Sequence, residues 1–179
     1  YCFRDAASGA EHAALVFGDI DGRAGVVVRV HSECLTSEVL QSLRCDCNAQ
    51  LQAAVREVAR QGSGVILYLR QEGRGIGLFH KVRAYALQDL GADTVDANIE
   101  LGFRPDEREF TCARRMLESL GVRSIELLTN NPEKCRRLLA AGVQIDRTRP
   151  IETPVTNENA VYLSIKGSRM GHVFAGLAA

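Results

Sequence analysis

Three cysteines, Cys34, Cys45 and Cys47, lie close together in the stretches HSECLT (31–36) and LRCDC (43–47). Thiolates are good zinc ligands, and three of them suit a tetrahedral Zn²⁺ with sulfur about 2.3 Å from the metal. Three protein ligands leave one coordination position for water, whose pKa zinc lowers to about 7. The cluster therefore predicts a zinc site able to hydrolyse an unreactive bond.

Other interpretations of the cysteines remain open at this point. A disulfide is disfavoured because Cys45 and Cys47 are separated by one residue and no secretory signal precedes them. Buried cysteines without a metal fit less well, since Cys-Asp-Cys in a polar stretch is not a core pattern. A closed structural zinc fits the spacing as well as an open one. Its fourth ligand would be His31, His80, Cys112 or Cys135.

Three further stretches carry residue types that bind polyphosphate. In RQEGRGIG (70–77), glycines let backbone N–H groups approach an anion, and Arg74 can bind phosphate with two hydrogen bonds. In TNNPEK (129–134), Lys134 follows a helix N-terminus by one turn. In RPDERE (104–109), an arginine and a carboxylate stand together. Each stretch also has a structural explanation: a strand-to-helix turn, an Asn-Pro helix cap, and a charged helix start with Asp106 and Glu109 as a capping pair.

Hydrophobic patterning predicts an α/β fold, a single domain of mixed β-sheet with flanking helices, to position these stretches. The expected strands are 12–17, 25–31, 64–70, 124–129 and 143–146, and the expected helices are 49–61, 78–90, 106–120 and a segment from 131 to Gly142. We expect residues 1–11 to be loose, the catalytic domain to span 12–174, and 175–179 to form a tail. Periodicity is weak beyond residue 150.

Composition limits the classes of partner. The chain has 179 residues with a formal net charge of zero, 46% apolar and 25% charged. This balance is typical of one globular domain and favours neither a nucleic-acid surface nor a membrane surface. We expect a cytoplasmic protein, because the sequence shows neither a signal peptide nor an apolar run long enough to span a membrane.

Taken in order, these motifs resemble GTP cyclohydrolase II, with similarity from about residue 12 to residue 174. The resemblance implies that GTP and water yield 2,5-diamino-6-ribosylamino-4(3H)-pyrimidinone 5′-phosphate, formate and pyrophosphate, the first step of riboflavin biosynthesis. It also implies one Zn²⁺ per subunit on the three cysteines, Mg²⁺ on the substrate phosphates, and a homodimer. The motifs are HSECLT (31–36), LRCDC (43–47), RQEGRGIGL (70–78), RAYALQD (83–89), LGF (101–103) and LLTNNP (127–132).

The resemblance assigns roles to individual residues. Arg108 becomes the nucleophile on the α-phosphate, giving a guanylylated arginine, and Asp106 the proton acceptor. Because a guanidinium is essentially always protonated, stabilising transition-state charge is a competing role for Arg108. The resemblance links Tyr85 to the hydrolysis that takes place at the zinc. The pattern alone is also consistent with a half-buried aromatic residue of a helix without a catalytic role. The implied nucleotide contacts are Arg29, Val30, His31, Ser32, Glu33, Gln50, Glu72, Gly73, Arg74, Thr94, Thr129 and Lys134.

Two other functions compete with the complete reaction. One is a paralogue that stops early and releases a formamido-pyrimidine, or that serves another guanine-derived pathway. The other is a silent GTP-binding protein with a structural zinc. The presence of Tyr85 disfavours early arrest. The intact set of three cysteines with Asp106 and Arg108 disfavours the silent protein.

Overall fold

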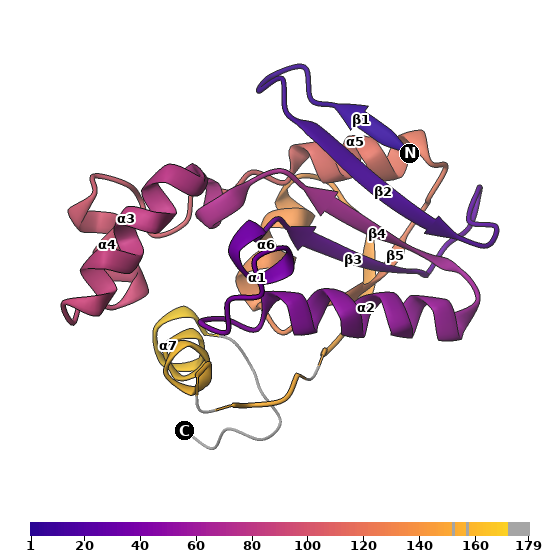
Figure 1. Ribbon diagram of the computed structural model, residues 1–179. Coiled ribbons are helices and arrows are strands. Elements are labelled where there is room, and N and C mark those ends of the chain that lie inside the picture. The colour runs from indigo at the N-terminus through magenta and orange to yellow at the C-terminus, as the bar shows by residue number, and fades with distance from the viewer. Residues whose placement is uncertain (152, 157, 172–179) are drawn as a thin grey trace.

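The computed structural model describes residues 1–151, 153–156 and 158–171, and it has the predicted α/β architecture around one mixed sheet (Figure 1). Within these residues the sheet has six strands, in the order β1-β2-β4-β3-β5-β6. Strands β3 to β6 run parallel to one another, while β2 is antiparallel to β4, and β1 is antiparallel to β2. The strands are β1 Cys2–Arg4, β2 Glu11–Phe17, β3 Val26–Ser32, β4 Gly64–Leu69, β5 Ile125–Leu128 and β6 Ile145–Arg149.

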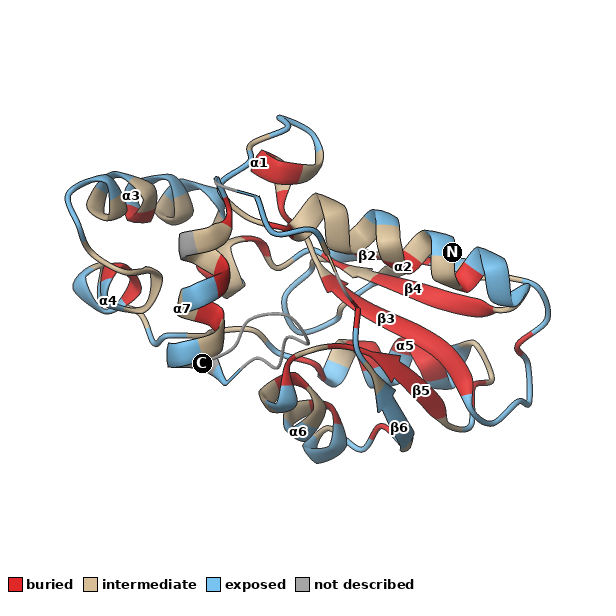
Figure 2. Ribbon diagram, turned by 90° about the horizontal axis from the view of Figure 1, so that it is seen from below, coloured by how far each residue is buried: buried red, intermediate tan, exposed pale blue. Residues whose placement is uncertain are grey.

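Helices cover both faces of the sheet, and the described helices are α1 Leu35–Glu38, α2 Cys47–Gln61, η1 Glu72–Gly75, α3 Gly77–Asp89, α4 Thr94–Glu100, α5 Thr111–Ser119, α6 Pro132–Ala140 and α7 Ala160–Met170. Helices α5 and α6 pack on one face, where the larger core cluster includes Val28, Leu67 and Leu127. Helix α2 packs on the other face against Val27 and Ile66. Because helices cover both faces, β3, β4 and β5 are buried along almost their whole length (Figure 2).

The side chains of β3 alternate between these two faces, as strand geometry requires. Val28 and Val30 belong to the core cluster under α5 and α6. Arg29 and His31 follow Val27 on the opposite face, beyond the apolar contact with α2, and both are nevertheless buried. Helices α3, α4 and α7 lie past the carboxyl ends of β3 and β4 in both views (Figures 1 and 2). In parallel α/β sheets this is the edge where ligands bind.

The predicted helix 106–120 is wrong over its first turn, because α5 begins only at Thr111. The preceding residues are held by other contacts: the Glu107 N–H donates to the Arg74 carbonyl, and the Arg108 N–H donates to Asp106 Oδ1. The expected Asp106–Glu109 capping pair is therefore not formed.

Residues 1–11 and the described residues after 150 contain secondary structure that the sequence patterns do not indicate. Residues 1–11, expected to be loose, include β1, whose Phe3 pairs with His12 of β2. The segment beyond residue 150 contains α7. The expected tail, 175–179, lies outside the described residues. No described helix is long and apolar enough to cross a membrane.

Candidate active site

A cavity of about 1100 Å³, a volume that includes open solvent at its mouth, lies at the carboxyl ends of the parallel strands. It receives residues from β3, the loop before α2, η1, α3, α4, α6 and α7, so segments far apart in the sequence meet there. Two predicted site residues do not line it: Val30 is a core side chain, and Asp106 lies behind Arg108. Those that do line it are Arg29, His31, Ser32, Glu33, Cys34, Cys45, Cys47, Gln50, Glu72, Gly73, Arg74, Tyr85, Thr94, Arg108, Thr129 and Lys134.

The three cysteines form a group with the dimensions of a zinc site. All three Sγ atoms lie within 4.8 Å of one another, and the Sγ atoms of Cys34 and Cys45 are 3.7 Å apart. A tetrahedron with zinc–sulfur bonds of about 2.3 Å has edges of about 3.8 Å, so the observed spacing fits. Within the described part of the chain, the group contains no fourth His, Cys, Asp or Glu. His31, one of the possible fourth ligands, instead places Nε2 2.6 Å from Glu38 Oε1.

A lysine that the sequence analysis missed stands beside this group. Lys81 Nζ lies 3.1 Å from Cys34 Sγ and donates to Thr36 Oγ1 at 2.8 Å and to Glu72 Oε1 at 2.7 Å. Hydrogen bonds from Cys45 and Cys47, together with the Lys81 charge, hold the pKa of the Cys34 thiol below its usual value. These contacts favour the thiolate of Cys34, the form that binds a metal, whereas the hydrogen bonds to Cys34 raise the pKa values of Cys45 and Cys47.

Tyr85 faces the same group from α3, one turn after Lys81. Its hydroxyl lies 3.2 Å from Thr36 Oγ1, and its ring centroid is 5.7 Å from Lys81 Nζ and 5.1 Å from the Arg44 guanidinium carbon. Burial raises the pKa of Tyr85, so the phenol keeps its proton at neutral pH. This geometry leaves Tyr85 able to donate a proton toward the cavity.

Buried cations gather where β3 and α6 line the cavity. Arg29 donates to the Leu128 carbonyl at 3.0 Å and to Gln50 Oε1 at 2.5 Å, while Lys134 Nζ donates to the Val30 carbonyl at 2.8 Å. Burial, followed by the charges of Arg29 and Arg108, lowers the pKa of Lys134 well below its usual value. Burial also lowers the pKa of Arg29 to about 10. Cations that lower one another's pKa values in this way favour the binding of an anion between them.

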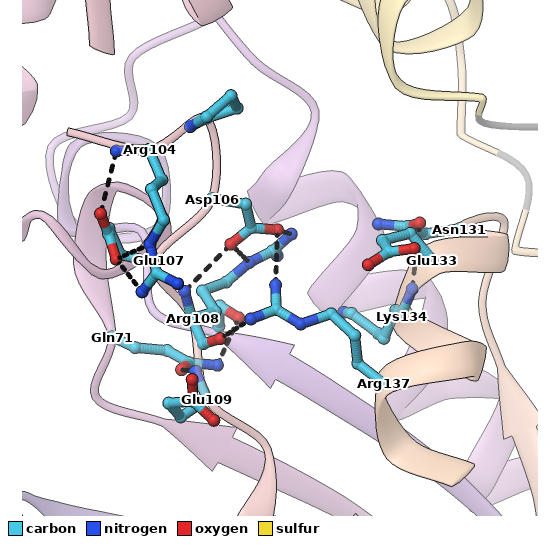
Figure 3. Close-up of polar contacts among 12 residues, drawn as sticks. Gln71, Arg104, Asp106, Glu107, Arg108, Glu109, Asn131, Glu133, Lys134 and Arg137 are labelled. Atoms are coloured by element: carbon cyan, nitrogen blue, oxygen red, sulfur yellow. Dashed lines mark hydrogen bonds and ion pairs between the residues drawn. The ribbon is translucent and has the colours of Figure 1, made fainter. Parts of the chain in front are cut away.

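The carboxylate of Asp106 is shared by two arginines, Arg108 and Arg137 (Figure 3). Asp106 accepts from Arg108 Nε at 2.9 Å and from Nη2 at 2.6 Å, and Arg137 Nη1 lies 3.3 Å from the same carboxylate. Burial opposes ionisation of Asp106, but the hydrogen bonds and charge of Arg108 outweigh it and lower the pKa of this carboxyl. The pKa of Arg108 is raised, since Asp106 outweighs the burial of the guanidinium. The pair is therefore ionised at neutral pH.

Arg137 was missed in the sequence analysis, although a signal for it exists. It stands three residues after Lys134 on α6, a spacing that puts both side chains on one helix face. Arg137 also donates through Nη2 to the Arg108 carbonyl, and its guanidinium carbon is 5.4 Å from the Phe110 ring centroid. It therefore holds both the side chain and the backbone of the Asp106–Arg108 pair.

The glycine-containing loop at residues 72–75 has left-handed backbone angles at two successive residues. Gly73 and Arg74 both adopt left-handed backbone angles, with φ of 61° and 60°. A Cβ at Gly75 would lie 2.9 Å from the Glu107 carbonyl carbon, so only glycine fits there. Among the described residues, Arg74 Nη1 has no hydrogen-bond partner despite its burial. Local strain combined with an unpaired buried donor is characteristic of a ligand site.

His31, which lines the cavity, belongs to a buried network of side chains. Its ring is stacked on Tyr68, and the Tyr68 hydroxyl donates to Glu38 Oε2 at 2.5 Å. Burial lowers the pKa of His31, which favours the neutral ring. With Nε2 directed at Glu38, His31 Nδ1 is left buried without a partner among the described residues.

The remaining predicted nucleotide contacts are held by hydrogen bonds to residues of nearby loops. Ser32 Oγ accepts from Gln71 Nε2 at 3.0 Å, and Glu33 Oε2 accepts from Arg70 Nε at 2.8 Å. Thr129 Oγ1 accepts from the Asn131 N–H at 3.1 Å. Thr94 begins α4, whose first turn is capped by the side chain of Asp93.

Comparison with known proteins agrees with this geometry. The model of the family described as GTP cyclohydrolase II matches residues 1–150. The GTP cyclohydrolase-2 of Azotobacter vinelandii is 53% identical over 175 residues, covering 98% of this chain and 84% of that protein. The GTP cyclohydrolase-2 of Escherichia fergusonii is 53% identical over 171 residues, covering 96% and 86%, and that of Yersinia pestis is 52% identical over 171 residues, covering 96% and 87%.

Proposed function

This chain belongs to the GTP cyclohydrolase II family, and we propose that it hydrolyses GTP to 2,5-diamino-6-ribosylamino-4(3H)-pyrimidinone 5′-phosphate, formate and pyrophosphate, which opens riboflavin biosynthesis. One observation carries the proposal: a group of three thiols and a cluster of buried cations share a single cavity. Zinc held by the thiols would support hydrolysis of the imidazole ring of GTP, and the cations would bind its triphosphate.

At the thiol end, Cys34, Cys45 and Cys47 would hold zinc. Bound zinc would supply a Lewis acid for hydrolysis of the ring. Lys81 offsets the negative charge of the sulfurs by its contact with Cys34. Tyr85, which is protonated at neutral pH and whose hydroxyl lies 3.2 Å from Thr36 Oγ1, would give a proton to the opened ring.

At the cation end, Arg29, Arg74 and Lys134 would bind the triphosphate. The orphaned Arg74 Nη1 and the depressed pKa of Lys134 both support an anion there. Glu33, Gln50, Glu72, Thr94 and Thr129, together with Val30, His31, Ser32 and Gly73, would complete the nucleotide contacts. Val30 can take part only through its backbone, because its side chain is in the core.

Arg108 would act on the α-phosphate, where the bond to the leaving pyrophosphate breaks. As a nucleophile it would first have to lose a proton, for which Asp106 is the adjacent acceptor. The raised pKa of Arg108 makes that transfer costly and supports the competing role, in which the guanidinium stabilises the charge that develops on phosphorus. A covalent guanylyl adduct on Arg108, sought by mass spectrometry, separates these two roles.

The proposed function also includes a magnesium ion, a second copy of the chain and a cytoplasmic location. Mg²⁺ would accompany the β- and γ-phosphates; this ion is bound largely by substrate phosphates and water and needs few protein ligands. Homodimer formation stays a prediction from the family resemblance. A cytoplasmic location stays a prediction from the sequence.

The test is a paired assay on the purified protein with GTP and Mg²⁺, with and without zinc chelation. Formate, pyrophosphate and the pyrimidine are followed by mass spectrometry. We expect chelation to abolish formate release and the diaminopyrimidine. A formamido-pyrimidine product would instead assign the chain to an early-stopping paralogue, and GTP binding without turnover would refute an enzymatic function.

A further inference from the structure

Helix α7 contributes a buried lysine to the cavity from outside the part of the chain that the family match covers. That match ends at residue 150, and α7 spans Ala160–Met170. Lys166 and Tyr162 of α7 line the cavity, and Lys166 Nζ lies 4.5 Å from the Tyr162 ring centroid. Lys166 is 7% exposed, although lysine is among the residues least often buried.

The partner of Lys166 stands between two of the thiols. Lys166 Nζ donates to Asp46 Oδ1 at 2.6 Å, and Asp46 separates Cys45 from Cys47 in the sequence. Asp46 is 1% exposed and is the N-cap residue of α2, which begins at Cys47. The Lys166–Asp46 contact therefore fixes the side chain of the residue whose backbone joins Cys45 to Cys47.

The second oxygen of Asp46 extends the chain of contacts toward the cations. Asp46 Oδ2 accepts from Gln50 Nε2 at 2.5 Å, and Gln50 Oε1 accepts from Arg29 Nη2 at 2.5 Å. Lys166, Asp46, Gln50 and Arg29 thus form one continuous series of hydrogen bonds. The series joins α7, the thiol loop and β3.

Stability alone does not explain a buried ion pair at this point. Desolvation of two charges offsets most of their attraction, and apolar residues of similar volume are often as stable or more so. A charged pair does, however, fix direction and distance more narrowly than apolar packing does. Partners that orient metal ligands act in this way in other metal sites.

We propose that Lys166 is a positioning residue, which acts through Asp46 to hold the loop of Cys45 and Cys47 and, through Gln50, to orient Arg29 for the substrate phosphates. This inference rests on the proposed function for the identity of the metal and the substrate. Its own claim is that α7 is part of the site. Removing the charge of Lys166 should therefore weaken both metal binding and substrate binding.

The experiment compares Lys166→Met, Asp46→Asn and the double variant with the wild type, each as the full chain. Ser164→Ala, at an exposed position of the same helix, is the matched control. Zinc affinity is measured by competition with a chromophoric chelator, without GTP, and thermal unfolding is recorded in parallel. We expect each single variant to bind zinc about 10-fold more weakly and to show a raised KM for GTP.

The double variant distinguishes positioning from structural support. It carries no unpaired buried charge, so we expect its thermal stability to recover while its zinc affinity stays low. Lys166→Arg, which keeps the charge, should recover part of the zinc affinity. The proposal would be overturned if the double variant recovered both thermal stability and zinc affinity. It would also be overturned if the zinc affinity of Lys166→Met lay within twofold of that of Ser164→Ala. Zinc binding by a wild type that releases no formate would refute the proposed function alone.

Discussion

Lys134 is only 6% exposed, and the charges of Arg29 and Arg108 act on it within the protein. We expect Lys134→Met to weaken substrate binding and to stabilise the fold. A hydrogen bond from a charged group contributes about 1.5–3 kcal/mol. Because about 1.4 kcal/mol corresponds to a factor of ten, loss of one Lys134–phosphate contact should weaken binding about 10- to 150-fold.

The expected change in stability has the opposite sign. Replacing buried charges by apolar residues of similar volume often stabilises by about 1–4 kcal/mol. Lys134→Met also loses the bond to the Val30 carbonyl, which offsets about 1 kcal/mol. We therefore expect a net gain of about 1 kcal/mol, or about 2–4 °C in Tm for a chain of this size.

The pH dependence follows from the direction of the Lys134 pKa shift. The pKa in the folded protein lies well below the usual 10.5, so the unfolded chain binds more protons between these two values. Stability of the wild type rises with pH across that window. The advantage of Lys134→Met should be full below the folded pKa and should vanish above about 10.5. An anion that restores the Lys134 charge should take up protons as it binds.

The assay is calorimetric titration with a GTP analogue that carries a methylene bridge between its α- and β-phosphates, in buffers of different ionisation enthalpy, together with thermal unfolding over a pH series. Arg136→Met is the matched control, since Arg136 lies on the same helix with its side chain 72% exposed. Unchanged affinity in Lys134→Met, or a loss of stability at neutral pH, would refute the reasoning about this cation cluster.

Three other substitutions separate the two ends of the cavity. Cys45→Ser should lose zinc and formate release yet keep pyrophosphate release; normal formate from a verified zinc-free variant would contradict the metal assignment. Arg108→Ala should abolish pyrophosphate release, and an unaltered rate would remove this residue from the chemistry. Arg137→Met should lower kcat about 10-fold with unchanged zinc content, because Asp106 loses an orienting partner. An unchanged kcat would limit Arg137 to packing on Phe110.

The parts of the fold that the sequence predicts well are those built by apolar periodicity. The expected helices at 49–61 and 78–90 match α2 and α3 within two residues. The expected strands at 25–31 and 64–70 match β3 and β4 within one residue. These elements share a buried face, and burial imposes the pattern that makes them recognisable.

The elements that were missed or misplaced depend on polar contacts instead. Helix α7 meets the rest of the molecule partly through the Lys166–Asp46 ion pair and the contacts of Arg169 with Asp93. Ion pairs of this kind do not produce a periodic pattern of apolar residues in the sequence. The segment before Thr111 has helical composition, but hydrogen bonds to Arg74 and Asp106 prevent it from winding into a helix.

The residues of the site likewise divide into those that the sequence predicts and those that only the fold brings together. Cys34, Cys45 and Cys47 are recognisable from residue type and spacing, because a metal site needs several ligands of one kind. Lys81 is not recognisable in this way, since a lysine on a helix is usually a solvated surface residue. Its importance appears only when the fold places its Nζ against both Cys34 and Glu72.

The contact series through Asp46 makes the two ends of the cavity interdependent. Arg29 reaches the thiol loop through Gln50 and Asp46, so the cation cluster and the sulfur group cannot shift independently. A long nucleotide that spans both ends therefore meets one preorganised surface, which lowers the entropy lost on binding. Gln50→Leu, which breaks the series at its middle, should therefore weaken zinc binding although Gln50 supplies no thiol. Zinc affinity equal to wild type in Gln50→Leu would show that the two ends are merely adjacent.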